Sequence, residues 1–142
     1  MYNYYFNENM YRSNNDIYRN NNMPSLYNPT VGFINGNMFS NLYTPYRNYK
    51  PQNLTPKNER EKLLLDLSKI SFAAHELKLY LDVNPNDNSM LTLFNDYTKK
   101  ANELKDEYET KYGVLESNNA NFNETPFAWE EGMWPWEAKF NV

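Results

Sequence analysis

The sequence has no cysteine, one histidine and only four glycines among its 142 residues. Without cysteine, disulfide bonds and thiol chemistry are excluded. One histidine and no cysteine cannot supply the ligands of a transition-metal site within a single chain. No glycine-rich phosphate loop is present, which argues against nucleotide binding. The inventory therefore predicts a protein that is not an enzyme and that carries no metal or other cofactor.

The single histidine stands in a fragment of a known metal motif. His75-Glu76 begins like the zinc-peptidase pattern H-E-x-x-H, but Leu79 occupies the place of the second histidine. A di-metal helical bundle would need a glutamate three residues before His75, and that residue is Phe72. Neither metal pattern is complete, so we expect His75 to have a structural role.

Long apolar runs and dense basic stretches are also missing. No apolar run approaches the roughly 20 residues that a membrane-spanning helix needs. No basic stripe typical of nucleic-acid-binding proteins occurs either. The first residues, Met1–Asn7, carry neither a basic nor an apolar region, so we expect no secretory signal there. The sequence therefore predicts no membrane span and no nucleic-acid partner.

Residues 1–54 are rich in asparagine and tyrosine and are interrupted by prolines. Neither the helical nor the strand period of apolar residues persists there, and asparagine side chains compete with regular structure by bonding to the backbone. We expect a low-complexity tail that is disordered or loosely ordered when isolated. It is either a passive spacer or a self-associating segment of the polar–aromatic type, in which tyrosines stack or become cross-linked.

Residues 55–115 carry a regular apolar pattern and are predicted to form two helices folded against each other. Apolar residues recur there at alternating steps of three and four, which keeps one side of each helix apolar. The turn is predicted at Asp82–Asp87, because Pro85 disfavours a helical conformation at Asn84. The antiparallel seam is predicted from Leu63, Leu67, Ile70, Ala74, Leu77 and Leu81 in the first helix and from Met90, Phe94, Tyr97, Ala101, Leu104 and Tyr108 in the second.

The helix ends are predicted from local signals. Thr55-Pro56 provides a capping side chain followed by a proline at the first helical position, and this helix should run to about Asp82. Asp87 or Asn88 can cap the second helix, which should end just before Gly113 in the left-handed conformation.

A second line of apolar residues widens the face of the first helix. Leu65, Phe72 and Leu79 recur every seven residues, and Tyr80 lies beside the last of them. Such a face is wider than one partner helix can cover. We therefore expect a third element, a second copy of the chain or another protein to cover it. Contact is expected at Phe72, Leu79 and Tyr80.

Aromatic residues concentrate again near the C-terminus, after a polar stretch. All three tryptophans fall within residues 129–136, and Pro135 stiffens the backbone between two of them. The rings either fold back on the open face of the hairpin or anchor a partner, since tryptophan is enriched at binding hot spots. The candidate partner-binding residues of this segment are Phe127, Trp129, Trp134, Pro135 and Trp136.

The predicted fold class is all-α: an antiparallel two-helix hairpin with long, largely irregular N- and C-terminal tails. The chain is predicted to divide into an Asn/Tyr-rich tail over residues 1–54, the helical hairpin over residues 55–115 and an aromatic tail over residues 116–142 that contains the Trp-Pro-Trp motif.

Three stretches of the sequence resemble the CotJB family of spore coat proteins. Phe72–Asp82 with Asn84–Asp87 is similar to the family's core pattern L-x-L-Y-L-D-x-x-P-x-D. The second helix is similar in Phe94-Asn95, Leu104-Lys105 and Lys111–Leu115, and Trp134–Glu137 resembles the closing W-P-W motif. The resemblance covers roughly residues 58–137 and leaves the tail 1–54 outside.

The resemblance implies a structural component of the bacterial endospore coat, made in the mother-cell cytoplasm and deposited on the forespore. It also implies two partners, a manganese-catalase-like coat protein (CotJC) and a short proline-rich coat protein (CotJA). Any catalase chemistry would then belong to CotJC, because this chain lacks the metal ligands. An alternative is a regulatory adaptor that controls delivery or activity of the catalase-like enzyme without staying in the mature coat. Self-association of the chain is a further alternative contact.

Overall fold

In the computed structural model, the described residues are 25–42, 47, 48, 50, 52, 54–116 and 125. They contain three helices, α2 (Pro29–Asn35), α3 (Glu59–Val83) and α4 (Asn88–Tyr112). Within this part of the chain no β-strand forms, and one isolated bridge pairs Leu26 with Phe39. The chain divides into two compact units, Met1–Gln52 with α2 and Asn53–Val142 with α3 and α4. The predicted all-α class is therefore confirmed.

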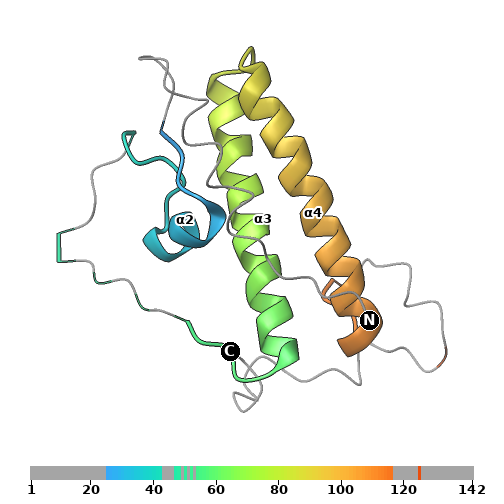
Figure 1. Cartoon of the computed structure of the whole chain (residues 1–142). Helices are drawn as coiled ribbons and strands as arrows, with labels where there is room; N and C mark the ends of the chain where they lie inside the picture. Colours follow the sequence, from blue (N-terminus) through green and yellow to red (C-terminus); the bar gives the residue numbers. More distant parts are fainter. Residues whose placement is uncertain are drawn as a thin grey trace. The chain divides into compact units, whose positions relative to one another are not determined.

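Helices α3 and α4 pack along each other as two helices of 25 residues each, joined by a short turn (Figure 1). At 1.5 Å per residue, each helix is about 37 Å long. The buried side chains follow the predicted seam, because the three-four spacing turns one face of each helix toward the other. They include Leu67, Ile70, Ala74 and Leu77 in α3 and Met90, Tyr97 and Tyr108 in α4, whereas Leu63, Leu81, Phe94, Ala101 and Leu104 are half-buried.

The start of α3 differs from the prediction. The helix begins at Glu59, and Asn58 rather than Thr55 is its cap. Asn58 Oδ1 accepts a hydrogen bond from Glu61 N at 2.8 Å, while the Glu61 carboxylate accepts from Lys57 N at 2.6 Å and from Asn58 Nδ2 at 3.0 Å. This reciprocal arrangement is a form of the capping box, and it satisfies the backbone N–H of Glu61, which Thr55 is too far upstream to reach. The prediction that Thr55-Pro56 starts the helix is therefore wrong.

The turn between α3 and α4 is organised by side chains at both helix ends. Asn84 ends α3 by donating from its backbone N and its Nδ2 to the carbonyl oxygen of Tyr80, at 2.9 and 3.1 Å. Asp87 caps α4, as predicted, because its Oδ1 accepts from the backbone N of Ser89 and of Met90, both at 3.1 Å.

The opposite end of the hairpin carries a polar link between the two helices. Arg60 Nε donates to the hydroxyl oxygen of Tyr108 at 3.0 Å, and the rings of Tyr108 and Tyr112 lie 5.3 Å apart at a tilt of 53°. Helix α4 ends at Tyr112, as predicted. Gly113 has a φ of 104° and a ψ of 171°, so it is not in the predicted left-handed helical conformation. A positive φ of this kind still favours glycine.

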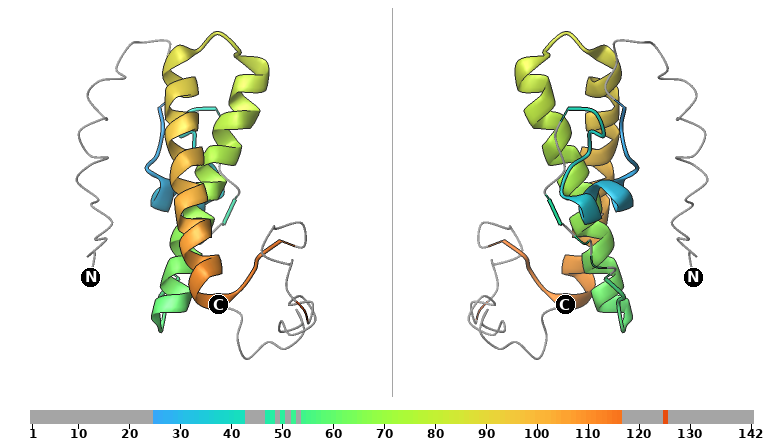
Figure 2. Two further views of the ribbon diagram at one scale, coloured as in Figure 1. Left: turned by 90° about the vertical axis from the view of Figure 1, so that its right-hand side faces the viewer. Right: turned by 90° about the vertical axis from the view of Figure 1, so that its left-hand side faces the viewer.

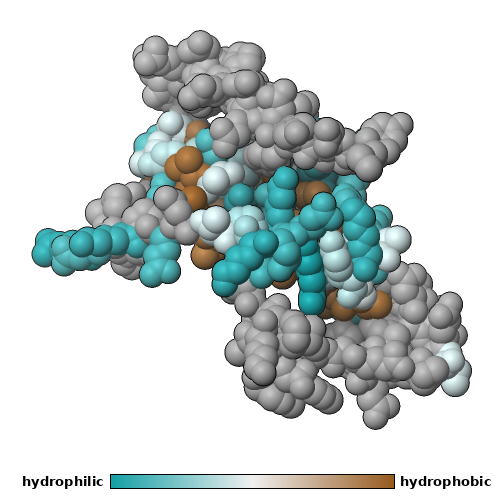
Figure 3. Space-filling view, turned by 60° about the horizontal axis from the view of Figure 1, so that its bottom comes forward, coloured by the Kyte–Doolittle hydropathy of each residue, from teal (hydrophilic) through white to brown (hydrophobic). Residues whose placement is uncertain are grey.

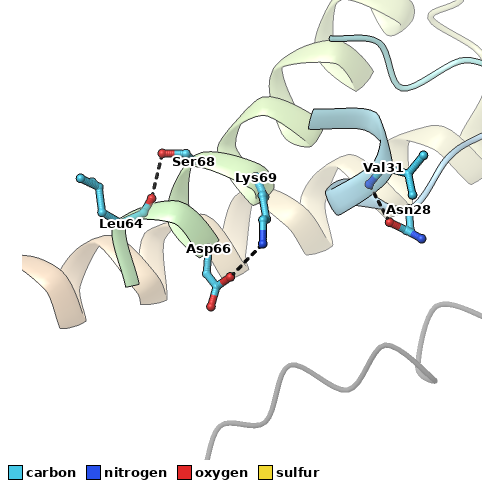
Figure 4. Close-up of polar contacts among 6 residues, drawn as sticks. All are labelled: Asn28, Val31, Leu64, Asp66, Ser68 and Lys69. Carbon is cyan, nitrogen blue, oxygen red and sulfur yellow. Dashed lines mark hydrogen bonds and ion pairs between the residues drawn. The ribbon is translucent and has the colours of Figure 1, made fainter. Parts of the chain in front are cut away.

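The first unit contains a small closed loop around α2. Asn28 caps the helix by accepting from Val31 N at 2.9 Å (Figure 4), Pro29 takes the first helical position, and Gly36 ends it with a φ of 68°. The segments on either side of α2 are then joined, because Tyr27 N donates to Met38 O and Ser40 N to Ser25 O, both at 2.9 Å.

Helix α2 corrects the prediction that residues 1–54 are disordered or loosely ordered. Asparagine and proline predict irregular chain here, but Asn28, Pro29 and Gly36 are the cap, the first position and the stop of a helix. Gly32 shows that the loop is specifically packed, since a Cβ atom there would collide with Sδ of Met38. Residues 1–24, 43–46, 49, 51 and 53 of the predicted tail lie outside the described ranges.

No helix among the described residues is both long and apolar enough to cross a membrane.

The corrected helix start leads to a test with a built-in control. Replacing Asn58 by alanine removes the cap of α3 and should lower the free energy of unfolding by about 1 kcal/mol. Thr55→Ala, at the wrongly predicted cap, should change it by less than about 0.5 kcal/mol, as expected for a surface site. Urea unfolding of the full chain, followed by circular dichroism at the helical band, measures both. A larger effect of Thr55→Ala would contradict the assigned cap.

Candidate functional site

The apolar line on α3 that carries the predicted contact residues Phe72 and Leu79 differs in exposure along its length. Leu65 is buried, Phe72 is half-buried and Leu79 is 49% exposed, although all three recur every seven residues on one side of α3. Apolar surface on this line is therefore uncovered toward the C-terminal end of α3, near the turn.

Val83 extends this exposed apolar surface. It is 80% exposed and lies four residues after Leu79, which places both on the same face of α3. We call Leu79 and Val83 the α3 end patch. The sequence reasoning missed Val83 because it stopped the helix at Asp82, and the four-residue spacing from Leu79 was the available signal.

Other exposed apolar residues do not extend the α3 end patch along its helix face. Leu91, which is 42% exposed, belongs to the first turn of α4. In the space-filling view, the surface of the described residues is largely hydrophilic, with small apolar areas between polar ones (Figure 3). The α3 end patch is thus the candidate contact surface for which both the sequence pattern and the exposure agree.

The third predicted contact residue on α3, Tyr80, is engaged within the hairpin itself. Its ring is half-buried, and its hydroxyl donates to Oδ2 of Asp87, the cap of α4, at 3.2 Å. Burial raises the pKa of the Tyr80 phenol above its usual value, and the charge and hydrogen bond of the Asp87 carboxylate raise it further. Tyr80 therefore ties the end of α3 to the start of α4.

Polar side chains on α3 satisfy one another locally (Figure 4). Ser68 Oγ donates to the carbonyl oxygen of Leu64 at 2.8 Å, and Lys69 Nζ lies 3.4 Å from Oδ1 of Asp66. The side chains of Lys69 and Asp66 are only 16% and 20% exposed, so this pair removes the cost of two partly buried, uncompensated charges.

The remaining candidate contact residues, Phe127, Trp129, Trp134, Pro135 and Trp136, lie outside the described residues. The described part of the chain ends its continuous run at Glu116, ten residues before the first aromatic cluster begins at Pro126.

No group of three or more histidine, cysteine, aspartate or glutamate side chains in the described ranges is arranged to hold a metal ion. His75 lies exposed on α3.

A family model described as CotJB protein matches residues 61–137 of the chain. The match spans more than half of the 142 residues and runs from the first turn of α3 through α4 to the Trp-Pro-Trp motif. It does not include the first unit with α2. No match was found among curated proteins or among solved structures.

The bond between Tyr80 and Asp87 predicts a defined pH dependence. Because the pKa of Tyr80 is raised on folding, the stability that its protonated hydroxyl contributes is complete below the unfolded pKa of about 10 and is lost as the pH rises through the folded pKa. Tyr80→Phe should therefore lower the free energy of unfolding by about 1 kcal/mol at pH 8, and the difference from the parent should shrink above pH 10.

Urea unfolding between pH 8 and pH 11 measures this difference. Tyr112→Phe is the matched control, because Tyr112 is exposed in the same pair of helices. An equal pH dependence in both variants, or none in Tyr80→Phe, would contradict the role of the bond.

Proposed function

Because the chain belongs to the CotJB family, we propose that it is a structural component of the bacterial endospore coat that docks with other coat proteins. The observation that carries the proposal is the family match over residues 61–137, since it includes both long helices and the aromatic segment. Members of this family are spore coat proteins. The first unit, with α2, lies outside the match and is assigned no role in docking.

The α3 end patch supports docking on a protein partner. Leu79 and Val83 expose apolar surface on one face of a helix that is otherwise held in the seam with α4. Among the described residues of this unit, α3 and α4 are the only helices, and no third described helix covers this face. An amphipathic or helical partner surface would gain roughly 25 cal/mol for each Å² of apolar area that it buries there.

We propose a manganese-catalase-like coat protein (CotJC) as the main partner and a CotJA-like coat protein as a second one, as the family resemblance implies. In this proposal the chain is not an enzyme. One histidine cannot supply the two Glu-x-x-His pairs of a di-metal helical bundle, so in this proposal peroxide chemistry belongs to the partner. The chain is made in the mother-cell cytoplasm and is then deposited with its partners on the forespore.

Coat assembly is tested by following the chain into mature spores. Replacing Trp134 and Trp136 together by alanine should reduce the amount retained in purified spores at least about tenfold, because hot-spot aromatics each contribute about 2 kcal/mol or more. Phe140→Ala is the matched control, since it removes an aromatic ring of the same segment beyond the family match. Immunodetection in washed spores and in mother-cell lysates measures the distribution.

Two outcomes would contradict this proposal. If the parent chain is abundant in the mother cell but absent from mature spores, it acts as an adaptor rather than a coat component. If the tryptophan variant is retained as well as the parent, the aromatic segment is not the anchor.

Docking through the α3 end patch predicts that changes in this patch lower the affinity for the partner. If each side chain contributes about 1 kcal/mol on burial, Leu79→Ser with Val83→Ser should raise the Kd for the catalase-like coat protein about thirtyfold. Leu91→Ser is the control, because Leu91 is similarly exposed but lies on α4. Size-exclusion chromatography with light scattering identifies the complex, and titration calorimetry gives its Kd. An equal rise of the Kd in both variants would show that the contact does not lie at the α3 end patch.

A further inference from the structure

Glu109 is the one charged residue that is buried in the described part of the chain, with only 8% of its surface exposed. It lies in the last turn of α4, where the helix dipole disfavours a negative charge. Neither the dipole nor the apolar seam therefore explains a carboxylate at this position. Its contacts give a different explanation.

Glu109 binds the chain that leaves α4 at two successive points. Its carbonyl oxygen accepts from Gly113 N at 3.2 Å, and its side-chain Oε1 accepts from Leu115 N at 3.1 Å. The first bond is an ordinary helix closure. The second joins a buried carboxylate to a backbone amide six residues further on, and hydrogen bonds to a charged acceptor are stronger than those between neutral groups.

A second contact lies one turn further back along the helix. Lys105 Nζ is 2.8 Å from Oε2 of Glu116, and Lys105 and Glu109 share a face of α4 because they are four residues apart. The hydrogen bond to Glu116 raises the pKa of Lys105 against the opposing effect of burial, and the charges of Glu116, Glu109 and Asp106 add to it. Because exposed ion pairs contribute little, the bond from Leu115 to Glu109 is the principal contact.

These contacts reverse the direction of the chain. Leu115 is bonded to Glu109 and Glu116 to Lys105, so successive residues after the helix lie beside successively earlier turns of it. Gly113 permits the reversal, since its φ of 104° is one that other residues rarely adopt. The orange segment that follows α4 accordingly turns back from the end of the helix (Figure 2). Val114 and Leu115 become half-buried in this arrangement.

We propose that Lys105, Glu109 and Gly113–Glu116 form an exit clasp that fixes where, and in which direction, the C-terminal segment leaves the hairpin. Glu109 is its positioning residue. The clasp places Glu116, after which the C-terminal segment begins, beside α4 rather than beyond its end. On the proposed function, this limits the region in which the tryptophans can meet a coat partner, so that hairpin and aromatic anchor engage the same partner in one orientation.

The clasp can be measured directly because the chain has no native cysteine. Cysteines introduced as Asn102→Cys, an exposed position on α4, and Ser117→Cys each accept a nitroxide label. Pulsed electron paramagnetic resonance then gives the distribution of distances between the labels. We expect a narrow distribution in the otherwise unchanged chain and a broad one, extended to longer distances, after Glu109→Ala.

Glu109→Gln is the matched control, since its amide oxygen can still accept from Leu115 N. It should keep the narrow distribution. Hydrogen exchange provides a second readout: the amide of Leu115 should exchange at least tenfold faster in Glu109→Ala than in Glu109→Gln. A broad distribution in the starting chain, or an unchanged one in Glu109→Ala, would overturn the clasp.

Helical circular dichroism shows whether Glu109→Ala is folded. If that variant does not fold, Glu116→Gln replaces it, because Glu116 is exposed and contributes only its bond to Lys105. That variant should broaden the distribution to a smaller extent. An unchanged distribution in a folded Glu116→Gln chain, together with slow exchange of Leu115 in Lys105→Gln, would overturn the contribution of the ion pair to the clasp.

Retention in spores separates the clasp from the proposed anchor. If Glu109→Ala broadens the distances and lowers retention while Glu109→Gln does neither, the positioning role is supported. If Glu109→Ala broadens the distances but its retention in spores is unchanged, while the tryptophan variant is lost from spores, the positioning role is overturned. If the tryptophan variant is retained too, the anchor has failed, whereas the clasp still stands or falls on its distances alone.

Discussion

The structure depends on the burial of one apolar face from each of two long helices against the other. Isolated helices gain little stability from their own hydrogen bonds, and tertiary packing of an amphipathic face normally supplies the rest. In α3 and α4 the buried side chains of this seam extend from Leu67 to Leu77 in one helix and from Met90 to Tyr108 in the other. The residues that fix the register and the ends of this pair are polar, and each acts at one end of the hairpin.

At the turn, Tyr80 connects the two helices through the cap of α4, and at the open end Arg60 connects them through the hydroxyl of Tyr108. Both are directional bonds between residues far from the middle of the seam. Apolar contacts spaced at three and four residues would tolerate a shift of one helical turn, but these bonds would not survive it. The apolar seam therefore holds the two helices against each other, and the polar bonds at the two ends of the hairpin fix their register.

The sequence predicted the parts of the fold that repeat and the parts that depend on a few adjacent residues. The seam residues, the turn after Asn84, the cap at Asp87 and the end of α4 at Tyr112 belong to these classes. The cap of α3 was misplaced because two nearby segments each carried a plausible signal, and the reciprocal pair of Asn58 with Glu61 was overlooked. Helix α2 was missed because a seven-residue helix has too few turns to establish a period.

Contacts between non-repeating residues were beyond the reach of pattern analysis. Nothing in the sequence marks Glu109 as buried, since a glutamate among charged residues of α4 predicts a solvated surface position. Its role follows only from the reversal of the chain at Gly113, which brings Leu115 back to the helix. The exposure of Val83 was similarly hidden, because an apolar residue beside a turn can be either covered or free.

On the proposed function, the presence of a helix pair and an aromatic segment in one chain has a consequence for the specificity of docking. A partner that binds the α3 end patch alone gains little, since two side chains bury little area, and an aromatic segment alone would bind many apolar surfaces. When both are present on one chain, the second contact forms at the effective concentration set by the connection between them. A connection that begins at Glu116, held by the clasp, contains fewer residues than one that begins at Tyr112, the end of α4. A shorter connection raises the effective concentration for partners whose two binding sites it can span, and lowers it for partners whose sites it cannot span. The exit of the chain from α4 would in this way act on partner choice without any contact to the partner.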